Sequence, residues 1–336
     1  MREIMDTAQK ACDFSGTILV KKQGQVLIEK GYGYRNRAEQ LDNRVETRFG
    51  IASGCKLFTG IAICQLAEKG KLSFDQQVKD LLPYSLPYAD DVTVHQLLTH
   101  TSGIADYFDE EIMDDFEALW VQRPMYHIRN LESFLPLFEK EAKMYQPGER
   151  FHYNNAGYIL LGLIVEKVSN QSFSDYVQEH IFQPAGMERS GYFEMDKLPD
   201  NTALGYVEET DGMYKTNIYS LPVKGGSDGG AYTTVHDMGR LWDALMHHRL
   251  LNETNTKLLL HPHAYSDQEE DFYGYGVWID QEVEGMKYHI MGYDPGVSFH
   301  AVHYPKYDVT AVVCSNESAG AYNMMYEIEQ YVEQQK

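Results

Sequence analysis

The alternation of hydrophobic and polar positions divides the chain into two strand-rich ends and a helical middle. Near the start, β-branched runs on either side of Gln23-Gly24 predict an antiparallel hairpin over residues 17–30. An apolar stripe near the end predicts a helix at Met324–Val332. In the final third, alternating and aromatic-rich runs predict strands at Tyr273–Ile279, Lys287–Met291, Val297–His303 and Val309–Cys314.

Between these ends the apolar residues recur at helical spacing. A stripe that follows Ser53 and stops at Gly70 predicts a long helix that begins at this serine. Further helices are predicted at Val94–Leu98, Leu131–Lys143, Ala156–Val168, Phe173–Phe182 and about Val235–His247. The pattern indicates an α+β fold, in which an antiparallel sheet built from both termini is flanked by helices and carries a helical subdomain.

The chain has no internal repeat and no long Gly, Ser or Pro linker. We therefore expect residues 1–336 to form a single catalytic domain with two subdomains. The sheet subdomain is expected at about residues 10–52 and 230–336, and the helical subdomain at about residues 53–229. A cleft should lie between them.

Composition excludes several classes of partner. The formal net charge is −21, from 29 Lys and Arg against 50 Asp and Glu, so the surface should repel nucleic acid. The longest apolar run, Tyr158–Val165, is far shorter than the roughly 20 residues that span a bilayer, so we expect no membrane segment. The N-terminal residues lack the apolar stretch of a signal peptide, so we expect a cytoplasmic chain as given, and an extracytoplasmic one if a leader was removed.

Metal and cofactor chemistry receive little support. The pairs His247-His248 and His261-Pro262-His263 lack a third ligand at a plausible spacing. The four cysteines are scattered and are expected to be free thiols. We therefore expect no metal and no cofactor.

The tetrad Ser53-Gly54-Cys55-Lys56 is the first candidate for chemistry. On a helix, the i, i+3 spacing places Ser53 and Lys56 on one face, where a hydroxyl and an amine can share a proton. The helix N-terminus adds positive potential and free N–H groups, which favour a neutral Lys56 and stabilise a negative oxygen. Such a tetrad occurs by chance in many proteins, so its weight depends on what accompanies it.

A second candidate, Tyr153-Asn154-Asn155, follows about 100 residues later. A tyrosine with a reference pKa near 10 acts in proton transfer only if cations such as Lys56 stabilise its phenolate or if it relays a proton. Asn155 would hold a substrate amide or Lys56. The alternative interpretation is that these residues merely begin the following helix, with an asparagine as its cap.

With these two motifs, the chain resembles the serine β-lactamase-like proteins: class C β-lactamases, D-alanyl-D-alanine carboxypeptidases of the penicillin-binding type, and related esterases. The resemblance runs from about Gly16 to Asn316 and implies a helical subdomain beside an antiparallel sheet, with acylation of Ser53 followed by hydrolysis. In addition to the two motifs, it rests on Val92–Gly103, Gln146–Phe151, Gly157–Gly162, Phe182–Met187, Gly229–Thr234 and Tyr273–Gly276.

The chain departs from the family at its third motif, a Lys/His-Thr/x-Gly triplet on an edge strand. Alignment through Pro295-Gly296-Val297 places Ile290-Met291-Gly292 there, without a cation. His289, one position earlier, could replace it only if the strand carries a bulge, because in a regular strand it faces the opposite side. Gly292 still permits close approach of the backbone, and an N–H of Gly292 or Tyr293 could form the oxyanion hole with that of Ser53.

The predicted function is a serine hydrolase that acts on a small-molecule or peptide acyl substrate. The candidate catalytic residues are Ser53, Lys56 and Tyr153, and the candidate substrate-binding residues are Asn155, His289, Gly292 and Tyr293. Penicillin-binding D,D-peptidase or β-lactamase is what the resemblance implies. The missing cation, which in the family helps to bind a substrate carboxylate, favours an esterase with weak β-lactam recognition. A catalytically silent binding or sensor protein is the rival interpretation.

Overall fold

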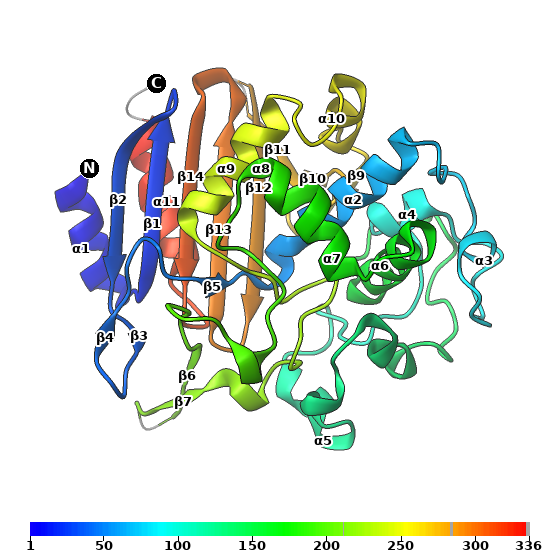
Figure 1. Ribbon diagram of the computed structural model, residues 1–336, viewed down its shortest axis with the longest axis horizontal. Helices are drawn as coiled ribbons and strands as arrows, with labels where there is room; N and C mark the ends of the chain where they lie inside the picture. The colour runs from blue at the N-terminus through cyan, green and yellow to red at the C-terminus, as the bar shows by residue number, and fades with distance from the viewer. Residues whose placement is uncertain (211, 283–284, 334–336) are drawn as a thin grey trace.

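A computed structural model describes residues 1–210, 212–282 and 285–333. Its centre is an eight-stranded sheet in which every neighbouring pair is antiparallel, in the order β2-β1-β14-β13-β12-β11-β10-β9 (Figure 1). The hairpin of the first two strands thus joins the last strand through β1, and the predicted α+β fold with a sheet built from both termini is confirmed. The strands are β1 (Gly16–Lys22), β2 (Gln25–Tyr32), β9 (Ala264–Ser266), β10 (Asp271–Tyr273), β11 (Trp278–Glu282), β12 (Gly285–Asp294), β13 (Val297–Tyr304) and β14 (Val309–Ser315).

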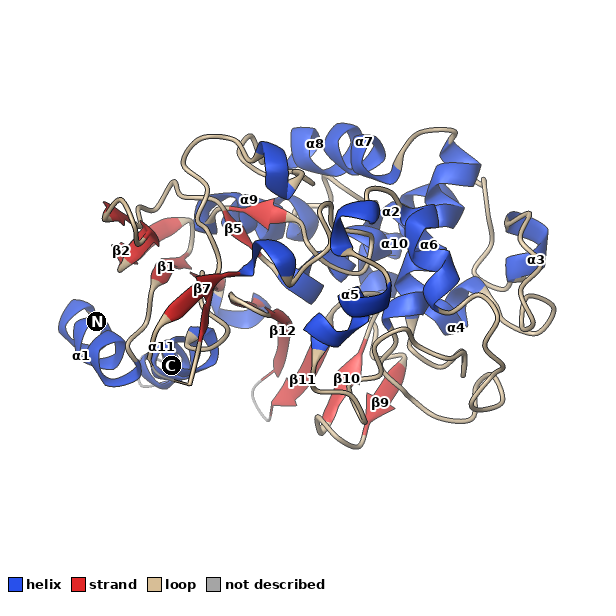
Figure 2. Ribbon diagram, turned by 90° about the horizontal axis from the view of Figure 1, so that it is seen from below, coloured by secondary structure: helices blue, strands red, loops and turns tan. Residues whose placement is uncertain are grey.

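Helices cover both faces of the sheet. On one face, α1 (Arg2–Cys12) and α11 (Ala321–Glu333) close a core that includes Met5 and Ile328. On the other face, α9 (Val235–Met246) packs against β1 and β14 (Figure 2). Because both faces are covered, β13 and β14 are buried at every position, including the polar residues Ser298, His300 and His303 of β13.

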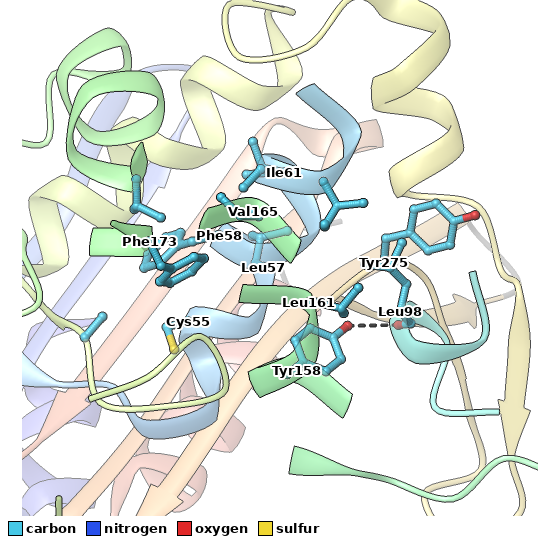
Figure 3. Packing of buried hydrophobic residues seen from close by; sticks show 14 of the residues in the cluster. Cys55, Leu57, Phe58, Ile61, Leu98, Tyr158, Leu161, Val165, Phe173 and Tyr275 are labelled. Carbon is cyan, nitrogen blue, oxygen red and sulfur yellow. Dashed lines mark hydrogen bonds between the residues drawn. The ribbon is translucent and has the colours of Figure 1, made fainter. Parts of the chain in front are cut away.

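The helical subdomain is built on two buried helices that contact each other, α2 (Lys56–Glu68) and α6 (Asn155–Ser169). Residues 56–66 of α2 and 155–165 of α6 are buried on all sides, as expected for helices without a polar face. Figure 3 shows part of this core, in which the Tyr158 hydroxyl donates to the Leu98 carbonyl at 2.9 Å. The two helices therefore provide a rigid base for whatever stands at their first residues.

Shorter elements complete the fold. The helices are α3 (Val78–Leu81), α4 (Val94–Leu98), α5 (Leu119–Gln122), α7 (Phe173–Val177), a π-helical turn (Gln178–Phe182), α8 (Gln183–Ala185) and α10 (Glu253–Leu259). The two-stranded pairs are β3 (Tyr34–Asn36) with β4 (Leu41–Asp42), β5 (Phe49–Gly50) with β8 (Tyr232–Thr233), and β6 (Tyr206–Glu208) with β7 (Tyr214–Thr216). Every helix in the described residues falls short of what crossing a membrane requires.

Two predicted elements are wrong in part. The predicted helix at Leu131–Lys143 is a 3₁₀ helix over Leu131–Leu137 with Pro136 inside it, followed by turns. The predicted strand at Tyr273–Ile279 is divided between β10 and β11, because Gly276 adopts a φ of +83° and turns the chain. The proposed subdomain boundaries stay a prediction.

Candidate active site

Ser53 lies at the N-terminal approach to α2, in the 3₁₀ turn η1 (Ala52–Cys55). The preceding segment is held in place by the pairing of β5 with β8 and by an Ile51 N–H bond of 3.0 Å to the Ala231 carbonyl. Ala52 has a φ of +43°, in the left-handed region that costs a residue with a Cβ roughly 1–2 kcal/mol. The fold maintains this strain at the residue before the candidate nucleophile, as is common at functional sites.

Lys56, one turn further along, is 1% exposed and has three acceptors. Its Nζ donates to Ser53 Oγ at 3.0 Å, to Asn155 Oδ1 at 2.7 Å and to the Asp228 carbonyl at 2.8 Å. The predicted contact between Ser53 and Lys56 is therefore present. Three acceptors match the three protons of an ammonium, so the resting site holds Lys56 in one fixed position.

Asn155 is the first residue of α6, but it is not the cap. The cap is Asn154, whose side chain accepts the Gly157 N–H at 2.7 Å. Asp106 accepts the N–H groups of Asn155 and Ala156 at 2.7 and 2.8 Å. The Asn155 side chain is consequently free to present its oxygen to Lys56, so the alternative interpretation of this motif as a simple helix start describes Asn154 only.

Tyr153 lies beside Lys56, whose Nζ is 4.7 Å from the centre of the tyrosine ring. The ring stacks on Trp278 with 6.2 Å between centroids and 9° between planes. Burial, reinforced by the charge of Glu110, raises the pKa of Tyr153 well above its ordinary value, although a hydrogen bond with Ser53 opposes the shift. Tyr153 is therefore protonated at neutral pH and is suited to relaying a proton rather than to acting as a resting phenolate.

Strand β12 forms the opposite wall of the site. A Cβ on Gly292 would lie 2.2 Å from the Ile51 carbonyl and 2.8 Å from the Ser53 nitrogen, so only glycine allows the strand to approach this closely. The pairing with β11 ends at His289, whereas the pairing with β13 continues to Asp294. Among the described strands, residues 290–294 thus form an open edge beside Ser53.

The residues at the family's third motif are apolar, as the alignment predicts. Ile290 is 2% exposed in the core, and Met291 lines a cavity beside Ser53. The ladder shows no bulge on either side of His289, so this residue faces away from Ile290. Its Nε2 lies 3.0 Å from Asp271 Oδ2, and it does not line either of the two cavities that adjoin Ser53. The condition for His289 to replace the missing cation is not met, and its role in substrate binding stays a prediction.

Two cavities meet at Ser53. The larger has a volume of about 540 Å³ and the smaller about 240 Å³. Both are lined by Ser53, Glu110 and Tyr293. The larger has an apolar wall that includes Phe116 and Leu221. A substrate whose reacting carbonyl is at Ser53 could therefore place its acyl and leaving groups on opposite sides of the serine.

Several acidic residues of the site are not predicted from sequence. Burial raises the pKa of Asp106 to about 7, and burial with repulsion from Asp228 raises the pKa of Asp294 to about 8. Burial also raises the pKa of Asp228, which accepts a hydrogen bond from the Tyr107 hydroxyl. Asp106 and Tyr107 lie in an irregular segment, and nothing local in the sequence marks Asp228 or Asp294.

Comparison with known proteins identifies the family to which this chain belongs. The sequence profile described as Beta-lactamase matches residues 1–333. The chain belongs to the β-lactamase family. The family resemblance of the two motifs is therefore confirmed.

Within the β-lactamase family, similar proteins include penicillin-binding proteins. "Penicillin-binding protein 4*" of Bacillus subtilis (strain 168) is 29% identical over 333 residues, covering 94% of this chain and 71% of that protein. The crystal structure of a penicillin binding protein from Bacillus halodurans is 57% identical, with a TM-score of 0.94 over 97% of this chain and 99% of that one. A D-amino acid amidase from Ochrobactrum anthropi SV3 shares the fold, with 17% identity and a TM-score of 0.85 over 100% of this chain and 99% of that one.

Metal binding finds no support in the described residues, where no group of three or more His, Cys, Asp or Glu side chains is arranged to hold an ion. His247 and His248 bind a backbone carbonyl and Thr256 instead. Ser53, Lys56 and Tyr153 supply the site with a hydroxyl, an amine and a phenol.

Proposed function

We propose that this β-lactamase-family protein is a serine hydrolase that forms an acyl-enzyme at Ser53. The observation that carries the proposal is the 3.0 Å contact between Ser53 Oγ and a buried Lys56 whose position is fixed by Asn155 and the Asp228 carbonyl. A serine is a weak nucleophile unless an adjacent base accepts its proton. A serine without a catalytic role would not require a buried lysine at hydrogen-bond distance.

The proposed reaction uses each group once. The Lys56 ammonium first loses one proton to solvent, and the resulting amine accepts the Ser53 proton while Oγ attacks the substrate carbonyl. Backbone N–H groups of Ser53 and Tyr293 stabilise the oxyanion. The protonated Tyr153 relays the proton to the leaving group. Water then attacks the acyl carbonyl, its proton passes through the same residues to Ser53 Oγ, and the acyl group leaves as the acid.

The proposed substrates are esters and peptide-type amides, with weak acylation by β-lactams. The names of the related penicillin-binding proteins support acylation by penicillins, and the shared fold of a D-amino acid amidase supports amide cleavage. Rapid reaction with penicillins is not expected, because Ile290 and Met291 occupy the positions where the family has a cation that binds a substrate carboxylate. The open edge of β12 remains available to a peptide backbone.

The rival proposal is a silent binding protein. Its basis is the altered triplet on β12. The intact geometry of Ser53, Lys56, Tyr153 and Asn155 opposes it, because a binding role does not require a strained Ala52 or a buried lysine at the serine.

The test is intact-mass spectrometry over time after mixing with benzylpenicillin or with p-nitrophenyl acetate, together with release of nitrophenol. We expect an acyl adduct that requires Ser53, formed faster with the ester. Ser53→Ala should abolish it. The matched control is Ser318→Ala, which removes a hydroxyl from the wall of the larger cavity. Absence of adduct and of turnover with both reagents would favour the binding protein.

A further inference from the structure

Glu110 stands at the junction of the two cavities, next to the proposed nucleophile. Asn155 Nδ2 donates to Glu110 Oε1 at 3.2 Å, while Asn155 Oδ1 accepts from Lys56 Nζ at 2.7 Å. Lys56 in turn donates to Ser53. Only two side chains therefore separate the carboxylate of Glu110 from the serine, and a ligand in either cavity meets it.

The backbone around Glu110 is anchored by its two neighbours. His152 lies between them, with Nδ1 2.9 Å from Glu111 Oε1 and Nε2 3.3 Å from Asp109 Oδ2. Arg150 also pairs with Glu111, at 3.2 Å. The side chains of Arg150 and His152 are thus engaged by residues 109 and 111, and Glu110 is left exposed to the cleft.

Glu110 itself has no cationic partner. In residues 1–210, 212–282 and 285–333, no lysine, arginine or histidine nitrogen lies within 4.0 Å of its carboxylate. Its one hydrogen-bond donor there is the neutral amide of Asn155. A carboxylate that ends in a substrate cavity without a counter-ion can form an ion pair with a ligand.

The walls around this junction favour a cation over an anion. Among the described residues, the larger cavity is lined by carboxyl side chains but by no lysine, arginine or histidine. The smaller cavity has one basic residue, Arg150, which Glu111 already engages. Ile290 and Met291 supply no charge at the position where the family has a cation. The donors of Lys56 are already taken by Ser53, Asn155 and the Asp228 carbonyl. An anionic acyl donor in the larger cavity would therefore meet exposed carboxylates such as Glu110 and Asp114 and no cation on its described lining.

We propose that Glu110 is a specificity-determining residue that binds an ammonium group close to the scissile carbonyl of the substrate. The preferred substrates are then aminoacyl esters or amides with a free amine, and not the carboxylate-bearing acyl donors of the family's penicillin-recognising members. This inference rests on the proposed function, because it concerns which acyl group reaches Ser53.

The test compares three p-nitrophenyl esters of similar size: the alanine ester, with an ammonium group, the neutral propionate ester, and the anionic succinate monoester. Both enantiomers of the alanine ester are used. Rates are measured below pH ~7, where an α-amine with a reference pKa of about 7.7 is protonated. The readout is the ratio of kcat/KM for the ammonium ester to that for the neutral ester.

Glu110→Gln retains the side-chain length and an oxygen that can accept from Asn155, but removes the charge. We expect wild type to prefer the ammonium ester and to disfavour the anionic one, and Glu110→Gln to lower the ratio by about fivefold or more, the upper end of an exposed ion pair. The matched control is Asp114→Asn, an exposed carboxylate on the larger cavity, which should leave the ratio within about twofold.

The outcomes separate the two proposals. An unchanged ratio in Glu110→Gln overturns the inference, because a carboxylate that only orients Asn155 would change the rates of both esters together. Ser53-dependent hydrolysis of the neutral ester without a preference for the ammonium ester overturns the inference and leaves the proposed function standing. Failure of wild type to hydrolyse any of the three overturns both.

Discussion

The site lies between a helical wall, formed by the first residues of α2 and α6 and the turn before α2, and a sheet wall, formed by β12. The two walls differ in how much of the family's motifs they retain. On the helical wall, Lys56 Nζ links Ser53 Oγ at 3.0 Å to Asn155 Oδ1 at 2.7 Å. On the sheet wall, β12 keeps the glycine that lets the backbone approach, but carries Ile290 and Met291 beside it. The side chains needed for acyl transfer and the side chains that select the acyl group can therefore change independently in one fold.

The largest effect on activity is expected from a substitution in the helical wall. Lys56→Met keeps the length of the side chain but cannot accept a proton, so we expect kcat/KM for a neutral ester to fall by about 10³-fold or more, the scale at which residues of a catalytic unit act. The matched control is Lys69→Met, an exposed lysine one residue after α2. A loss of less than about tenfold in Lys56→Met would contradict the proton-transfer role.

On the sheet wall, Gly292→Ala tests the close approach of the strand. Its Cβ would overlap the Ile51 carbonyl at 2.2 Å, so β12 must move away from Ser53. We expect kcat/KM to fall by about 10²-fold, the scale of losing one oxyanion donor, with a smaller effect on KM. Thermal unfolding should still show a cooperative transition, and full activity in this variant would place the oxyanion hole elsewhere.

Asp294, at the end of β12, gives a pH-dependent prediction. Burial raises its pKa to about 8, above that of the unfolded chain, so between pH ~4 and ~8 the folded protein holds a proton that the unfolded chain has released. The stability is therefore lost as the pH rises through this window. Asp294→Asn cannot ionise and should raise the free energy of unfolding by at least about 1 kcal/mol more at pH ~9 than at pH ~5.

Denaturant unfolding at the two pH values measures this difference. The control is Asp267→Asn, an exposed carboxylate on the wall of the smaller cavity, which should show no such dependence. Equal changes at both pH values in Asp294→Asn would show that this carboxyl is solvated in the folded protein.

The smallest effect is expected from a substitution that tests whether the sheet wall selects the substrate by charge. Met291→Lys places a cation in the smaller cavity, and we expect kcat/KM for an anionic ester to rise by about three- to fivefold relative to a neutral ester. Met286→Lys, an exposed position on the same strand, is the control. A similar gain in both variants would indicate a general effect of net charge on encounter with the anion, and not recognition at the site.

Sequence predicts the helical wall better than the sheet wall, for a physical reason. The Ser53–Lys56 contact follows from helical spacing, and α4 was predicted at Val94–Leu98, where hydrophobic period and capping agree. The turn at Gly276 could have been predicted from the Gly-Tyr-Gly sequence. The reason that glycine is required there lies far away in the sequence, because a Cβ on residue 276 would lie 2.4 Å from the Lys56 carbonyl.

The acidic residues of the site show the limit of sequence. Glu110 lies in an irregular segment with no period, and its contact with Asn155 spans 45 positions. Asp228 and Asp294 become part of the site only when separate strands and loops converge on Lys56. Such contacts depend on topology, which local propensity does not encode.

The pairing of β1 with β14 also has a consequence for how the protein is made. Gly16 lies opposite Ser315, so a chain emerging from the ribosome holds the β1–β2 hairpin without its central neighbour until β14 has been synthesised. Gly292, which abuts Ser53, also emerges late. Closing such distant segments slows folding. From the synthesis of Lys56 until that of Gly292, the nascent chain therefore carries Ser53 and Lys56 without the strand that forms the opposite wall of the site, and hydrolytic activity is expected only after the sheet has formed.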